Sequence, residues 1–185
     1  VNEFQKAVDL DRENYVAYRN LGFAELRGGA FHSAVRSLER AAELAPNDPL
    51  TLFDLGVAYE RTGELKKGRD VIRRGLDLRN YAEARETYTE VLHSCAGDRM
   101  AQARAAYASN DYIRAELLFR EILRDYPDYA WAYAYLGHTY HHQRPARPRK
   151  AEAMYRAALD ALVYTHLPDL ERAYILDNLG MIRFN

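Results

Sequence analysis

The stretch that decides the fold is residues 15–82, which read YVAYRNLGFAELRGGAFHSAVRSLERAAELAPND and then PLTLFDLGVAYERTGELKKGRDVIRRGLDLRNYA. The second half repeats the first at an offset of 34 residues, so that Leu21-Gly22 corresponds to Leu55-Gly56 and Gly29 corresponds to Gly63. Apolar residues in each half recur at helical spacing and are interrupted by turn residues. The pattern predicts a repeated unit of two amphipathic helices joined by a short turn.

Each expected helix pair carries small residues where its two helices face each other. These residues are Gly22 with Ala34, Gly56 with Gly68, Ala103 with Ala115, and Gly137 with Ala151. Antiparallel helices approach closely only where their side chains are small. The four pairs therefore mark the expected points of closest packing, with bulky residues filling the space around them.

Later parts of the chain carry a fuller version of the same motif. An aromatic residue, Leu-Gly and a tyrosine recur at Tyr133, Leu136, Gly137 and Tyr140, and the second half of a unit recurs at Ala115, Phe119 and Pro127. In these residues the chain resembles the tetratricopeptide repeat family over nearly its whole length. The resemblance implies an all-α fold, namely a right-handed α-solenoid of stacked antiparallel helix pairs whose first helices line a concave groove.

We expect a single solenoid over residues 1–185, with about four full or near-full repeats. The expected segments are a partial second helix at 3–11, repeats at 15–48, 49–79, 96–129 and 130–164, and a partial first helix at 169–184. The repeat at 130–164 holds a short insertion. Partial repeats at both ends indicate a fragment of a longer solenoid, or helix exchange between molecules.

Residues 80–95 have a helical pattern but no partner helix within the repeat scheme. Tyr81, Ala84, Tyr88 and Val91 match a second helix, yet no first helix precedes them. We expect an inserted helix at 80–95. The alternative is that the helix at 64–78 continues to about residue 94.

Composition excludes several classes of function. The 185 residues include 26 Lys and Arg against 27 Asp and Glu, a net charge of −1, so nucleic-acid binding is not expected. No apolar run is long enough for a membrane span, and a lone cysteine, Cys95, excludes an internal disulfide framework. No catalytic motif or phosphate-binding loop occurs, which predicts a chain without enzymatic activity, cofactor or metal. The compartment stays open, with cytoplasm favoured over a bacterial periplasm.

Two local clusters admit a second interpretation. His138, His141 and His142 share one helix at i, i+3 and i+4, a spacing that suits two imidazoles on one metal. We favour histidines that line the groove or lie near a turn, without a ligand. The basic stretch 144–150 is expected to be a solvated loop. The alternative is that it binds an acidic partner or nucleic acid.

The resemblance also implies which residues face the groove. They are Arg19, Asn20, Phe23, Phe53, Asp54, Val57, Met100, Arg104, Trp131, Tyr135, His138 and Asn178, with Tyr107 and His142 beside them. Exposed aromatic residues and Arg are typical anchors of protein interfaces. The competing interpretation is that Phe23, Phe53 and Trp131 pack against neighbouring first helices.

These residues predict a protein–protein interaction scaffold that binds a peptide or helix of a partner protein in the concave groove. The alternative is a sensor or oligomerisation arm of a bacterial regulator, or of an envelope export or assembly complex, which self-associates through exposed terminal helices. Some members of the family bind the C-terminal carboxylate of heat-shock chaperones through a Lys/Asn clamp. Phe23 and Asp54 stand where that clamp needs Asn, so chaperone-tail binding is not expected.

Overall fold

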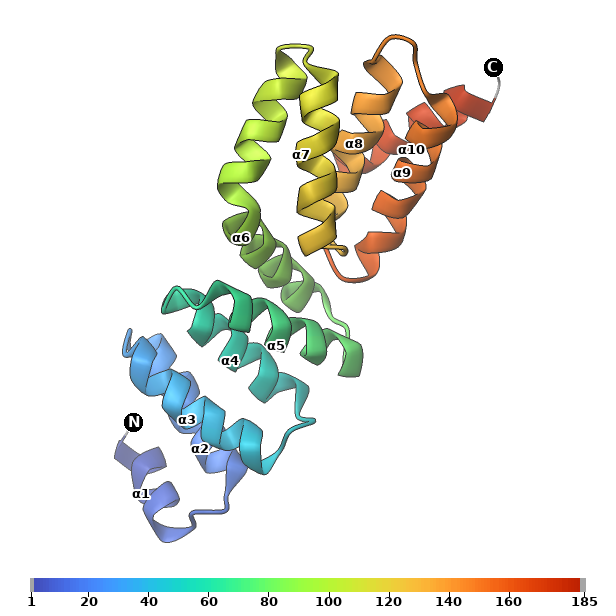
Figure 1. The fold of residues 1–185 in the computed structure, drawn as a ribbon. Coiled ribbons are helices and arrows are strands. Elements are labelled where there is room, and N and C mark those ends of the chain that lie inside the picture. Colours follow the sequence, from blue (N-terminus) through green and yellow to red (C-terminus); the bar gives the residue numbers. More distant parts are fainter. Residues whose placement is uncertain (1, 184–185) are drawn as a thin grey trace. The chain divides into compact units, whose positions relative to one another are not determined.

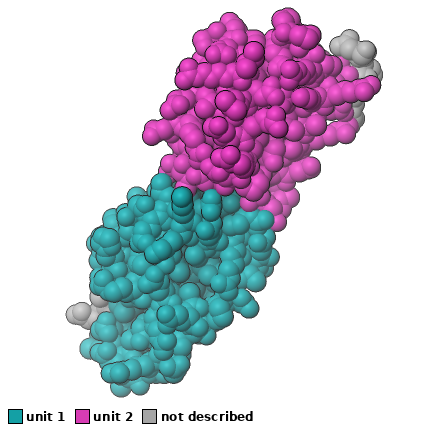
Figure 2. All heavy atoms as spheres, viewed as in Figure 1, with its two compact units in different colours: residues 1–91 teal, residues 92–185 magenta. Residues whose placement is uncertain are grey.

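A computed structural model describes residues 2–183 and shows only helices and connecting turns in that range (Figure 1). The expected all-α fold of antiparallel helix pairs is confirmed. The fold divides into two compact units, residues 1–91 and 92–185 (Figure 2).

The first unit contains two complete helix pairs. The first pair is α2 (Tyr15–Arg27) with α3 (Phe31–Leu44), and the second is α4 (Pro49–Arg61) with α5 (Leu65–Leu78). The short helix α1 (Asn2–Leu10) packs against α2, and α3 packs against α4. Side chains of Asn14 and Asp48 accept hydrogen bonds from the backbone N–H of Ala17 and Thr51, at 3.0 and 2.9 Å. These caps satisfy backbone groups that a helix start leaves free, and they fix where α2 and α4 begin.

The turn within each of these pairs depends on a glycine. Gly29 and Gly63 have φ of +78° and +82°, a backbone conformation that residues other than glycine rarely adopt. The two residues are equivalent in the 34-residue offset. The turn geometry therefore repeats together with the sequence.

The second unit contains the C-terminal part of α6 (Ala82–Ala108), followed by α7 (Tyr112–Asp125), α8 (Ala130–His142), α9 (Pro148–Asp160) and α10 (Asp169–Arg183). A single 3₁₀ turn, η1 (Ala161–Val163), follows α9. Contacts join α7 to α8, α8 to α9, and α9 to α10. In the view of Figure 1, α7 and α9 lie in front of α8 and α10. The last residue of the partial helix expected at 169–184, Phe184, lies outside the described residues.

Helix α6 corrects the prediction of a separate inserted helix at 80–95. Residues 82–108 form one helix, which joins that segment to the first helix of the following repeat. The alternative was also wrong, because α5 ends at Leu78 and Arg79 is extended with φ −152°. Between residues 94 and 98 only Gly97 disfavours helix, and one glycine inside a helix costs about 1 kcal/mol. Helix formers on both sides outweigh that cost.

The small residues lie where the helices of a pair meet, as predicted. A Cβ on Gly22 would be 2.5 Å from Leu38 Cγ, and one on Gly137 would be 2.6 Å from Tyr155 Cδ1. At Gly56 an added Cβ would overlap Ile72 Cγ1. Leu38 and Tyr155 are fully buried, so the second helix of each pair inserts a large side chain against the glycine of the first.

Candidate binding site

The second unit holds a continuous aromatic cluster on α8. Trp131 and Tyr135 are stacked, with ring centroids 6.2 Å apart and planes 18° apart. The Arg104 guanidinium of α6 lies 5.5 Å from the centroid of the Tyr135 ring, in the range of a cation–π contact. Trp131 and Tyr135 are half-buried and Arg104 is exposed. We call Arg104, Trp131, Tyr135 and His138 the α8 cluster.

The α8 cluster rests on a rigid support. Phe119 of α7 is fully buried and stacks on Tyr135, with centroids 5.7 Å apart and planes 19° apart. His93 contacts the edge of Trp131 at 5.7 Å. Because aromatic rings packed on both sides lose little entropy when they meet a ligand, such a surface is preorganised for binding.

His138 is enclosed by aromatic rings. Its imidazole centroid lies 4.7 Å from that of Tyr174, 5.4 Å from that of Tyr155 and 5.7 Å from that of Tyr135. Burial, with smaller contributions from nearby His142 and His141, lowers the pKa of His138 to about 4. The imidazole is therefore neutral at pH 7. Its Nε2 atom is buried and has no hydrogen-bond partner among the described residues.

The predicted second interpretation of the histidines was a metal site. His142 Nδ1 instead lies 2.9 Å from the carbonyl oxygen of His138 and 3.3 Å from the Tyr107 hydroxyl. Within residues 2–183, no group of three or more His, Cys, Asp or Glu side chains is arranged to hold a metal ion.

Two predicted groove residues of the second unit are not available to a partner. Met100 is 6% exposed and Asn178 is 2% exposed. The Asn178 side-chain amide donates to the carbonyl oxygen of Tyr174 at 2.8 Å. Both side chains pack inside the unit, and the expectation that they face a groove was wrong.

In the first unit, the predicted residues include one exposed aromatic. Phe23 is 49% exposed, whereas Phe53 is half-buried with its ring 5.6 Å from Tyr81 in an edge contact. Asn20 and Val57 are half-buried as well. The competing interpretation, packing, therefore describes Phe53 better than Phe23.

Charged groups of the same unit gather around Asp54. Burial raises the pKa of the Asp54 carboxyl to about 6, nearby Arg19 opposes the rise and Asp48 adds to it. The Arg19 guanidinium lies 3.8 Å from an Asp48 carboxylate oxygen and 3.5 Å from the side-chain oxygen of Asn20. The Tyr81 hydroxyl is buried without a hydrogen-bond partner in the described structure. This side of the first unit therefore has spare hydrogen-bonding capacity and a carboxyl that holds its proton more tightly than an exposed aspartate does.

The raised pKa of Asp54 predicts a specific pH dependence of stability. The Asp54 carboxyl has a higher pKa in the folded chain than in the unfolded chain. It therefore does not lower the free energy of unfolding below pH 4, where it is protonated in both states, and it lowers that free energy increasingly as pH rises towards 6. The free energy of unfolding of the wild type, relative to that of Asp54→Asn, should fall by on the order of 2 kcal/mol between pH 4 and pH 7. Urea titrations of both chains at each pH measure this difference. A difference that is constant with pH, or that rises, would contradict the burial of this carboxylate.

Two site residues were missed by sequence reasoning. Tyr81 was assigned to the core of an inserted helix, and Tyr174 was not singled out. Tyr174 precedes Asn178 by four residues, so helical spacing placed both on one face of α10. That Tyr174 then meets His138 depends on contacts between helices far apart in sequence, for which the sequence holds no signal.

The paired helices, the repeated glycine turns and the close contacts at small residues define a helical repeat protein. Residues 20–79 match the family model for the tetratricopeptide repeat, which confirms the predicted resemblance over that segment. No described helix combines the length and the apolar character that crossing a lipid bilayer requires.

A curated relative and several solved structures are similar to the chain. Anaphase-promoting complex subunit 3 of Schizosaccharomyces pombe is 33% identical over 75 residues, which are 40% of this chain and 11% of that protein. MamA has a TM-score of 0.46 at 19% identity, covering 85% of this chain and 84% of that one. YrrB, described as a TPR protein with an unusual peptide-binding site, has a TM-score of 0.41 at 18% identity, covering 85% and 91%. The TPR2AB domain of yeast Sti1, solved in complex with pHSP90, has a TM-score of 0.46 at 16% identity, covering 99% and 75%.

Proposed function

We propose that the chain is a non-catalytic protein-interaction module whose α8 cluster binds a peptide or helix of a partner protein. The observation that carries the proposal is the contiguity of Arg104, Trp131 and Tyr135, which the sequence placed on two separate helices and the fold brings into contact. Trp, Tyr and Arg supply most of the binding energy at protein interfaces. A flat, stacked aromatic surface with one guanidinium suits an apolar side chain flanked by a carboxylate or carbonyl group.

In the first unit, Arg19, Asn20, Phe23 and Asp54 belong to the same proposal as a second, weaker contact region. Phe23 offers an exposed aromatic ring, and Arg19 and Asp54 offer opposite charges close together. Self-association through the terminal helices also stays a prediction. The feature on which it depends is the set of exposed apolar side chains on α10, Leu170, Leu176 and Met181.

The proposed function is tested by selecting binders from a display library of random peptides on the full chain. For the peptides selected, we expect Trp131→Ala to weaken affinity by about tenfold or more, because an aromatic anchor at an interface centre contributes roughly 2 kcal/mol. Fluorescence polarisation of the labelled peptide measures the change.

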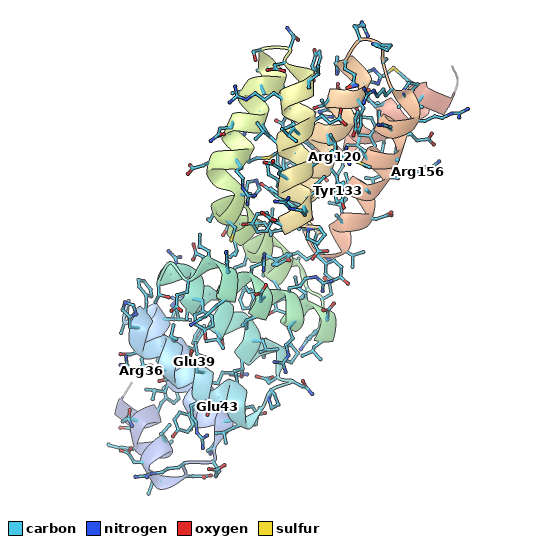
Figure 3. The ribbon with its side chains drawn as sticks, in the orientation of Figure 1. Arg36, Glu39, Glu43, Arg120, Tyr133 and Arg156 are labelled. Atoms are coloured by element: carbon cyan, nitrogen blue, oxygen red, sulfur yellow. The ribbon has the colours of Figure 1, made fainter. Side chains whose placement is uncertain are left out.

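Tyr133→Ala is the matched control. Tyr133 is half-buried on the same helix, two residues from Trp131 and Tyr135, and helical periodicity places it on the opposite face (Figure 3). We expect selected peptides to bind this variant as they bind the wild type, provided that circular dichroism shows it folded. Peptides that bind Trp131→Ala unchanged while Tyr133→Ala loses them would refute the assignment of the α8 cluster.

A further inference from the structure

The second unit has a surface groove that shares no residue with the α8 cluster. Its largest depression, of about 730 Å³, lies along α7 and is lined by Ile113, Leu117, Arg120 and Arg124, among others. A second depression of about 440 Å³ shares Arg120 and Arg124 and extends to α9. A third, of about 450 Å³, shares Ile113 and extends to the loop between α8 and α9. We call these three depressions together the α7 groove; α7 and α9 face the viewer in Figure 1.

The α7 groove is lined by apolar side chains that folding leaves in water. Ile113 is 87% exposed and Leu117 is 59% exposed. The two residues are four apart on α7 and therefore lie on one face of the helix. Leu123 and Met154 extend the apolar lining towards α9. An exposed apolar row within a depression is typical of a surface that a partner covers.

The rim of the α7 groove is cationic, although the chain as a whole is nearly neutral. Five cations line it, Arg120, Arg124, Arg144, Arg147 and Lys150, against three carboxylates, Asp111, Glu116 and Glu121. Two of these carboxylates are already engaged. Asp111 accepts from the backbone N–H of Arg114 at 3.1 Å, and Glu116 accepts from the Tyr140 hydroxyl at 3.0 Å and pairs with Arg147 at 3.3 Å.

The cations, by contrast, keep much of their exposure. The side chains of Arg120, Arg124 and Arg147 are 66%, 75% and 45% exposed. Arg120 and Arg147 pair with Glu116 at 3.6 and 3.3 Å, and Arg124 pairs with Asp125 at 3.5 Å. Exposed pairs at such distances contribute little to stability, so carboxylates of a partner can compete for these guanidinium groups.

We infer that the α7 groove docks an acidic amphipathic helix of another protein. Apolar residues of that helix at i, i+4 spacing would pack on Ile113 and Leu117, and its carboxylates would meet Arg120, Arg124 and Arg147. The exposed apolar side chains and the carboxylates of Glu116 and Glu121 suit a protein helix better than a phosphate backbone. The site is separate from the α8 cluster and shares no residue with it, so the chain would hold two partners, or two segments of one.

The test uses a fluorescein-labelled peptide of about 16 residues, with leucines at i, i+4 spacing and Glu and Ala elsewhere. We expect the full chain to bind it, and to bind a version with Lys in place of Glu at least tenfold more weakly. Arg120→Glu together with Arg124→Glu should weaken binding of the acidic peptide by about tenfold or more. Raising the salt concentration should weaken it as well, because exposed charges are screened.

Matched variants control for charge and for exposed apolar area. Arg36 (labelled in Figure 3) and Lys66 are exposed positions of the first unit. Arg36→Glu with Lys66→Glu makes the same change of net charge and should leave affinity unchanged. Ile113→Ser should weaken binding several-fold, whereas Leu10→Ser, at a side chain 88% exposed, should not. Both positions are so exposed that folding should tolerate the change, which circular dichroism checks.

Several results would overturn the inference. The inference fails if the acidic peptide does not bind below about 1 mM, if the basic peptide binds equally well, or if Arg120→Glu with Arg124→Glu leaves binding unchanged. Displacement of the peptide by duplex DNA at lower concentration would reassign the groove to nucleic acid. A dimer in light scattering that Ile113→Ser converts to a monomer would reassign it to a second copy of the chain.

Discussion

Gly56→Ala should lower the free energy of unfolding of the first unit by about 1–3 kcal/mol, the usual cost of forcing extra atoms into a packed core. The added Cβ would overlap Ile72 Cγ1 and lie 2.8 Å from Ile72 Cδ1 and 3.2 Å from the carbonyl oxygen of Gly68. Ile72 is 1% exposed, so its side chain has no free space to enter. Denaturant unfolding followed by circular dichroism, with hydrogen exchange of the α4 and α5 amides, measures the loss.

The same substitution at Gly97 should have the opposite sign. Nothing lies within 4 Å of a Cβ at Gly97, in the middle of α6. Replacing an unconstrained helical glycine by alanine stabilises a helix by about 1 kcal/mol. If Gly56→Ala were as stable as Gly97→Ala, then close helix contact at Gly56 would not exist. Ile72→Ala should cost less in the Gly56→Ala chain than in the wild type, because it removes Cγ1 and Cδ1, the two atoms that the added Cβ would meet.

Phe119→Ala should have the largest effect on the second unit, a loss of about 3–5 kcal/mol. The Phe119 side chain is fully buried and stacks on Tyr135, so truncation leaves a cavity beneath the α8 cluster. Trp131 is the only tryptophan in the chain, and its fluorescence reports the unfolding of this unit directly.

Leu117→Ala provides the comparison for Phe119→Ala. Leu117 precedes Phe119 by two residues on α7 and is 59% exposed, so its truncation should cost within about 0.5 kcal/mol. A Phe119→Ala chain that unfolds at the same denaturant concentration as Leu117→Ala would show that the α8 cluster is not supported by the core.

Local signals in the sequence predicted most of the fold. Gly22, Gly56 and Gly137 mark helix contacts because close approach depends on the two facing residues alone. Asp48 and Gly63 mark a helix start and a turn for equally local reasons. The prediction of a separate helix at 80–95 was wrong for an equally local reason. A helix continues unless a residue stops it, and Gly97 by itself does not.

The binding site was less predictable, because exposure depends on which helices pack over a residue. Trp131, Tyr135 and His138 follow helical spacing on α8, so their common face was visible in the sequence. The burial of Met100 and Asn178 and the contact of Tyr174 with His138 arise from packing between helices distant in the chain. No spacing rule within one helix reports such contacts.

The most direct test of the proposed function is the fluorescence of Trp131 during titration with a peptide selected on the full chain. Because Trp131 is the only tryptophan and lies in the α8 cluster, a peptide that binds there changes the polarity around its indole. We predict a saturable shift in emission with the same dissociation constant that polarisation of the labelled peptide gives. Emission that stays constant while the peptide saturates the chain would contradict binding at the α8 cluster.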